Sequence, residues 1–81
     1  MNFTSLPVIG AWRVDVELRE DPRGSFTRAL CEHEFRDQGL DAHIVQASTS
    51  YNRRAGTLRG LHNQLPPASE VKMGRVIRGA I

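Results

Sequence analysis

The chain reads Arg13-Val14-Asp15-Val16-Glu17-Leu18-Arg19, a stretch in which charged and apolar residues alternate at every position. A period of two places the apolar side chains on one face of an extended segment and the charged ones on the other. The stretch is followed by Asp21-Pro22-Arg23-Gly24, which has Asp, Pro and Gly at the positions that a type I turn favours. We therefore expect a strand over 13–19 and a hairpin-like reversal into a second strand over 25–30.

A short helix is predicted next. Residues 32–38 read as one or two helical turns, and Gly39 stands where a glycine commonly closes a helix. We expect this helix to be peripheral to the strands.

The remaining residues predict further strands separated by turns. The β-branched run at 44–51 and the segments 57–64 and 70–77 favour extended structure, with turns at Asn52–Gly56, Pro66-Pro67 and Arg78-Gly79. Many short strands joined by Gly and Pro turns are typical of an all-β antiparallel sandwich or barrel. A double-sheet jelly roll needs about eight strands, and these residues supply about five or six. We therefore expect either the front half of a longer protein or a sheet edge that another chain completes.

Length and composition limit the function classes. The 81 residues suffice for one small domain, and a net charge of +2, from 11 Lys and Arg against 9 Asp and Glu, is too balanced for a typical nucleic-acid binder. Only the basic residues Arg53, Arg54, Arg75 and Arg78 favour nucleic acid, so an anionic small molecule fits better. The lone Cys31 excludes a disulfide within the chain and favours a reducing compartment. With no apolar run near the roughly 18 residues of a membrane span and no signal-like start, we expect a soluble cytoplasmic protein.

The segment Thr57-Leu58-Arg59-Gly60-Leu61-His62-Asn63-Gln64 holds a histidine, a guanidinium and an amide close together. His62 is the leading candidate for a general base, because an unperturbed imidazole titrates near a pKa of about 6.5; the alternative is a hydrogen-bonded structural histidine. Strand alternation places Gln64 on the face of His62 and Arg59 on the other. Arg59 joins that face only if the strand twists or bulges at Gly60; otherwise it is a surface arginine.

Three further residues are candidates for binding or catalysis. Arg23 lies in a turn where its planar fork of donors suits a diphosphate, and Phe26 could stack on a base or sugar. Lys72 follows Glu70 by two positions and could stabilise an enolate oxygen. The alternatives are a solvated turn arginine, a core phenylalanine and a surface lysine.

Metal and nucleophile chemistry have little support. The chain has no His-x-His or Glu-x-x-His ligand pattern, and its three histidines, His33, His43 and His62, are widely separated. The serines and threonine at 48–50 lack an evident base partner. Because no glycine-rich phosphate loop is present, side chains must hold any phosphate. We expect no metal and no cofactor.

Three blocks of sequence, in this order, resemble the dTDP-4-dehydrorhamnose 3,5-epimerase family. They are Asp21-x-Arg23-Gly24-x-Phe26, then Val45-Gln46 followed by Ser50, then Leu58-Arg59-Gly60-Leu61-His62-Asn63-Gln64 with the run to Lys72-x-x-Arg75. The resemblance implies a cupin-like jelly roll, with residues 1–81 as the amino-terminal part of a single domain. It also implies a homodimer, formed by sheet pairing, that serves cytoplasmic dTDP-rhamnose or deoxysugar biosynthesis.

The resemblance implies roles for individual residues. His62 is the base that removes protons at C3 and C5 of dTDP-4-keto-6-deoxyglucose, Lys72 holds the enolate, and no metal or redox cofactor takes part. Arg23 and Arg59 grip the diphosphate. The other substrate-binding positions are Phe26, Arg28, Gln46, Ala47, Ser48 and Gln64.

The chain departs from the family pattern at several points. Arg28 stands where the family commonly has glutamate, and Ala47-Ser48-Thr49 replaces an Asp-Asn-His-like run. Tyr51 does not match the family's tyrosine acid, and we expect that tyrosine and the acidic partner of the base beyond Ile81. An alternative function is therefore a non-catalytic cupin-like module that binds an anionic sugar or pairs its sheet edge with another chain.

Overall fold

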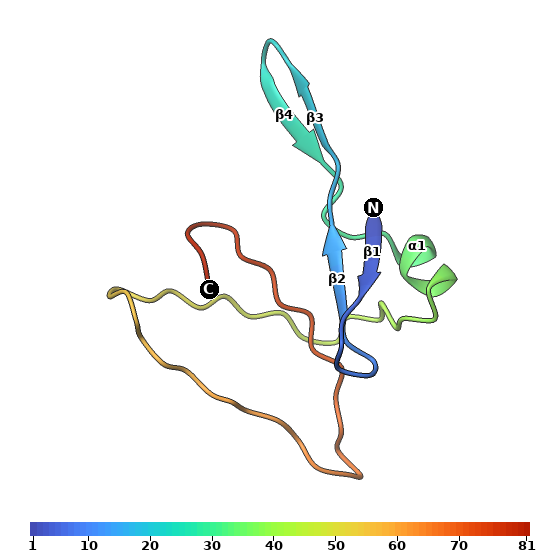
Figure 1. The fold of residues 1–81 in the computed structure, drawn as a ribbon, viewed down its shortest axis with the longest axis vertical. Coiled ribbons are helices and arrows are strands. Elements are labelled where there is room, and N and C mark those ends of the chain that lie inside the picture. Colours follow the sequence, from blue (N-terminus) through green and yellow to red (C-terminus); the bar gives the residue numbers. More distant parts are fainter. The chain divides into compact units, whose positions relative to one another are not determined.

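A computed structural model describes residues 1–81 as two compact units, 1–45 and 46–81. All regular secondary structure belongs to the first unit (Figure 1). Its elements are β1 (Asn2–Ser5), β2 (Trp12–Asp15), β3 (Leu18–Asp21), β4 (Gly24–Thr27) and α1 (Glu32–Asp37).

Strands β1 and β2 form a two-stranded antiparallel sheet in which Phe3 lies opposite Val14. The Leu6 amide donates to the carbonyl oxygen of Ala11 at 2.9 Å, which closes the connection between the two strands. Strand β1 was not predicted from the sequence. Its four residues offer only one half-buried apolar position, Phe3, and this is too little alternation to signal a strand.

The predicted strand over 13–19 is two strands in the structure. Strand β2 pairs with β1, whereas β3 pairs with β4, so the segment is interrupted at 16–17 where its partner changes. The predicted reversal at 21–24 is confirmed, because Asp21 lies opposite Gly24 in the antiparallel β3–β4 pair. The Asp21 carboxylate stabilises this turn by accepting the Arg23 amide at 2.8 Å.

The predicted helix is confirmed as α1. Gly39 has a φ of +72°, and hydrogen bonds of 2.9 Å run from its amide to Arg36 and from the Leu40 amide to Phe35, which is the Schellman pattern of a helix end. The helix is less peripheral than expected, because it carries Phe35, the one buried hydrophobic residue, which is 6% exposed. The Phe35 ring meets that of Phe3 edge to face, with centroids 5.2 Å apart. No helix here has the length and apolar character that a membrane span requires.

The second unit, 46–81, contains turns but no strand. The turns expected near Gly56, Pro67 and Gly79 are present as turns or bends, whereas the strands predicted at 44–51, 57–64 and 70–77 are wrong. One backbone–backbone hydrogen bond is found in this unit, from the Ala68 amide to Leu65. A β-prone segment becomes a strand only when a neighbour pairs with its amides and carbonyls, and these segments have no such neighbour in the structure.

Candidate functional site

The structure brings the two predicted catalytic residues, His62 and Lys72, into contact. The Lys72 ammonium donates to the backbone carbonyl oxygen of His62 at 2.7 Å and forms an ion pair with Glu70 at 3.1 Å. His62 itself is exposed, and its ring makes no hydrogen bond in the structure. The imidazole is thus available to a ligand, and the Lys72 ammonium is hydrogen-bonded to the backbone of the same residue.

Arg59 is held by a neighbouring turn. Its Nε donates to the Asn52 side-chain oxygen at 2.5 Å and its Nη2 to the Tyr51 carbonyl oxygen at 3.3 Å. Gly60 adopts a φ of +97°, so the backbone is irregular at the glycine where a twist or bulge would let Arg59 join the face of His62. Because no strand forms here, strand alternation does not place Arg59 and His62 on opposite faces. Asn52 was missed as a partner of Arg59, although its position in a predicted turn was the available signal.

Four other predicted substrate-binding residues are exposed and make no side-chain hydrogen bond. They are Gln46, Ala47, Ser48 and Gln64. The structure does not gather them into a pocket with His62, so their role stays a prediction.

Arg23 lies at the tip of the β3–β4 hairpin with its side chain 90% exposed. Its Nη2 forms an ion pair with the Asp21 carboxylate at 2.7 Å. This side-chain hydrogen bond, with a smaller contribution from the Arg23 amide, lowers the pKa of Asp21 below its ordinary value. The guanidinium is therefore partly neutralised by a residue of the same turn.

A hollow of about 250 Å³ opens within the first unit and contains two predicted substrate-binding residues, Phe26 and Arg28. Phe26 is 73% exposed, so it is not the core residue that the alternative interpretation suggested. An exposed ring beside a guanidinium suits an aromatic or sugar ring that carries an anionic group. The lining residues are Met1, Glu17, Arg19, Phe26, Thr27, Arg28 and Glu34.

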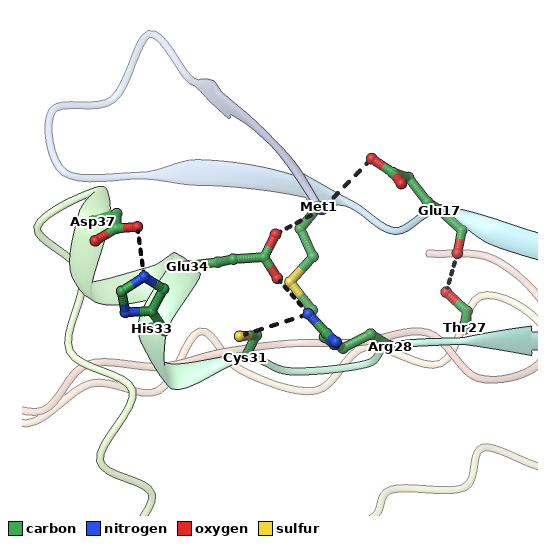
Figure 2. A network of polar contacts seen from close by, with 8 residues as sticks. All are labelled: Met1, Glu17, Thr27, Arg28, Cys31, His33, Glu34 and Asp37. Atoms are coloured by element: carbon green, nitrogen blue, oxygen red, sulfur yellow. Dashed lines mark hydrogen bonds and ion pairs between the residues drawn. The ribbon is translucent and has the colours of Figure 1, made fainter.

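Glu34 lies at the centre of the polar contacts beside this hollow (Figure 2). One carboxylate oxygen accepts the Met1 ammonium at 3.0 Å, and the other is 3.4 Å from Arg28. The Met1 ammonium also lies 3.7 Å from Glu17, and the Arg28 guanidinium lies 4.0 Å from the sulfur of Cys31. Arg28 is therefore tied to the first turn of α1.

The contact between Met1 and Glu34 shifts the titration of both groups. The Glu34 hydrogen bond raises the pKa of the Met1 ammonium, and the ammonium lowers the pKa of Glu34. Sequence reasoning missed Glu34, although an acidic residue in the first turn of a helix is a common stabilising feature. The structure contains no group of three or more His, Cys, Asp or Glu side chains that could hold a metal ion.

Comparisons with known proteins agree on one family. Residues 5–81 match the sequence profile described as dTDP-4-dehydrorhamnose 3,5-epimerase. The chain is 36% identical, over its whole length, to a dTDP-4-dehydrorhamnose 3,5-epimerase of Sinorhizobium fredii, and 39% identical to one of Mycobacterium tuberculosis. It is 32% identical, again over its whole length, to a dTDP-4-dehydrorhamnose 3-epimerase of Streptomyces niveus. It spans 42%, 40% and 39% of these relatives respectively. No solved structure matches.

Proposed function

Because the chain belongs to the dTDP-4-dehydrorhamnose 3,5-epimerase family, we propose that it acts as a nucleotide-sugar epimerase on dTDP-4-keto-6-deoxyglucose. We further propose that residues 1–81 form the amino-terminal part of a single cupin-like jelly-roll domain. The antiparallel β1–β2 and β3–β4 pairs support an antiparallel fold of that kind. A cytoplasmic homodimer that serves dTDP-rhamnose or deoxysugar biosynthesis remains our prediction for the protein in the cell.

The proposed reaction begins with proton removal at a carbon next to the C4 ketone. Neutral His62 takes the proton from C3 or C5, and the electron pair of the broken C–H bond moves onto the ketone oxygen as an enolate. Lys72 stabilises that oxygen with its ammonium group. A proton donor on the opposite face of the sugar then supplies a proton to the carbon. The enolate electron pair forms the new C–H bond and the ketone is restored, which inverts the carbon, and His62 releases its proton to water. The contact of 2.7 Å between Lys72 and the His62 carbonyl oxygen is the observation that carries this proposal.

The substrate's negative charge suits the arginines among the proposed substrate-binding residues. Arg23 and Arg59 would hold the diphosphate, because a guanidinium binds phosphate oxygens through two parallel hydrogen bonds. Phe26 offers an exposed ring to the nucleotide or sugar. The remaining proposed substrate contacts are Arg28, Gln46, Ala47, Ser48 and Gln64.

Deuterium exchange tests the proposed chemistry directly. Proton NMR in deuterated water follows the loss of the C3 and C5 proton signals of dTDP-4-keto-6-deoxyglucose after the chain is added. We expect loss of at least one of these signals. A folded chain that leaves both signals unchanged would contradict the catalytic proposal.

A second candidate function is a non-catalytic cupin-like module that binds an anionic sugar or assembles with another chain. The observation that favours it is the hollow in the first unit, which the exposed Phe26 ring and the Arg28 guanidinium line together. Titration calorimetry with dTDP and sedimentation, together with the proton-exchange experiment, separate the two functions. Nucleotide binding or self-association without proton exchange would support the module, whereas exchange would support the enzyme.

A further inference from the structure

Arg19 and Phe26 lie directly opposite each other in the β3–β4 pair. Residues opposite each other in an antiparallel pair project to the same face, with their Cβ atoms about 4.5–5.5 Å apart. Both also line the hollow of about 250 Å³ in the first unit. One ligand can therefore contact the ring and the guanidinium together.

We propose that Arg19 is a further substrate-binding residue, which holds the phosphate groups of a thymidine nucleotide whose base or sugar packs on Phe26. The inference rests on the proposed function and extends it to a residue outside the three sequence blocks that led to the family. Its chemical basis is the planar guanidinium, which matches the oxygens of a phosphate, next to an exposed aromatic face.

The Arg19 side chain has no ion-pair partner in the structure, unlike the other arginines of the first unit. Each of those forms an ion pair with a carboxylate: Arg13 with Asp15, Arg23 with Asp21, Arg28 with Glu34, and Arg36 with Glu32. Arg19 makes no ion pair and no side-chain hydrogen bond. Its donors are thus available without the loss of an existing contact.

The acidic residues of the hollow do not compete for Arg19. Glu34 accepts the Met1 ammonium at 3.0 Å, and Glu17 lies 3.7 Å from the same ammonium. Arg28 supplies Glu34 with a second positive partner at 3.4 Å. With these charges paired, Arg19 leaves the hollow with a surplus of positive charge, which favours an anionic ligand.

Titration calorimetry with dTDP tests the proposal on the whole chain. Arg19→Gln keeps a polar side chain of similar length and removes the charge, so we expect its Kd for dTDP to rise about tenfold or more, as loss of a charge-assisted hydrogen bond implies. Arg19→Lys keeps the charge without the planar fork, and we expect an intermediate loss. Arg13→Gln is the matched control, because Arg13 is an exposed strand arginine that does not line the hollow.

The ligand series distinguishes phosphate binding from a structural effect. Thymidine lacks phosphate, so Arg19→Gln should weaken the binding of dTDP much more than the binding of thymidine. Arg13→Gln should weaken the binding of neither ligand. Equal dTDP affinity in wild type and Arg19→Gln, or an equal loss for both ligands, would overturn the assignment of Arg19. Either result would leave the proposed epimerase chemistry untouched. Conversely, Arg19-dependent dTDP binding without any proton exchange would support this site and contradict the proposed catalysis.

Discussion

The side-chain ammonium of Lys72 lies 2.7 Å from the backbone carbonyl oxygen of His62, ten positions earlier in the chain. This hydrogen bond links the proposed base to the proposed enolate-stabilising cation. The same ammonium pairs with Glu70 at 3.1 Å, so its charge is held between a carboxylate and a carbonyl. The contact places a positive charge close to the backbone of the base.

Replacement of Lys72 by Met removes that charge and retains most of the side-chain length. We expect the rate of proton exchange at C3 and C5 to fall by about 10²-fold or more, which is typical when a group that stabilises a developing oxyanion is lost. Single-turnover proton NMR in deuterated water measures the rate.

Glu70→Gln is the matched control for Lys72→Met. It removes the acidic partner but leaves the ammonium in place, and we expect exchange to remain near the wild-type rate. Wild-type exchange in Lys72→Met would show that the cation has no part in the reaction.

The ion pair of Met1 and Glu34 predicts that the stability of the first unit depends on pH. Because the pKa of Glu34 is lowered from its ordinary 4.5, its stabilising effect is present above that value and is lost as pH falls through the lowered pKa. Because the pKa of the Met1 ammonium is raised from its ordinary 8.0, its contribution is present below that value and is lost as pH rises through the raised pKa. The stability of the first unit should therefore decline at both acidic and basic pH.

Amide hydrogen exchange in α1, corrected for the intrinsic pH dependence, measures this window. Glu34→Gln should abolish the losses of stability at acidic and basic pH that arise from this ion pair, because it removes the charge on which both pKa shifts depend. Asp37→Asn, on the same helix, is the control and should retain both losses. Identical pH profiles for wild type and Glu34→Gln would contradict the assignment.

Phe35 should contribute more to stability than any other apolar residue of the first unit, because it is the one hydrophobic side chain that is buried. We expect Phe35→Ala to lower the free energy of unfolding by about 3 kcal/mol, since it removes the edge-to-face contact with Phe3 and leaves a cavity. Urea unfolding followed by circular dichroism measures the change. Phe26→Ala, at a ring that is 73% exposed, should cost only about 0.5 kcal/mol. Equal costs at the two positions would contradict this account of the core.

Local sequence signals predicted the turn at 21–24 and the helix of the first unit, but not β1. The turn at 21–24 depends on residues within the turn itself, and its Asp21 side chain accepts the Arg23 amide as the residue pattern suggested. The helix likewise ends at Gly39 through contacts within one turn. Such features require no distant partner, so the sequence is sufficient to predict them.

Features that depend on distant partners were predicted less well. The segments at 44–51, 57–64 and 70–77 have residues suited to strands, but a strand also needs a paired neighbour, and none pairs with them. The same limit applies to the candidate site. Residue type made His62 and Lys72 candidates, whereas the contact of Arg28 with Glu34 depends on how the chain folds back.

The most direct test of the central claim is proton exchange at C3 and C5 of dTDP-4-keto-6-deoxyglucose in deuterated water, measured for wild type and His62→Ala. His43→Ala, at a histidine with no proposed role, is the control. The account predicts exchange in wild type and in His43→Ala, and a rate lower by about 10²–10⁴-fold in His62→Ala, as expected when a general base is lost. Equal exchange in wild type and His62→Ala would contradict the claim that His62 is the base.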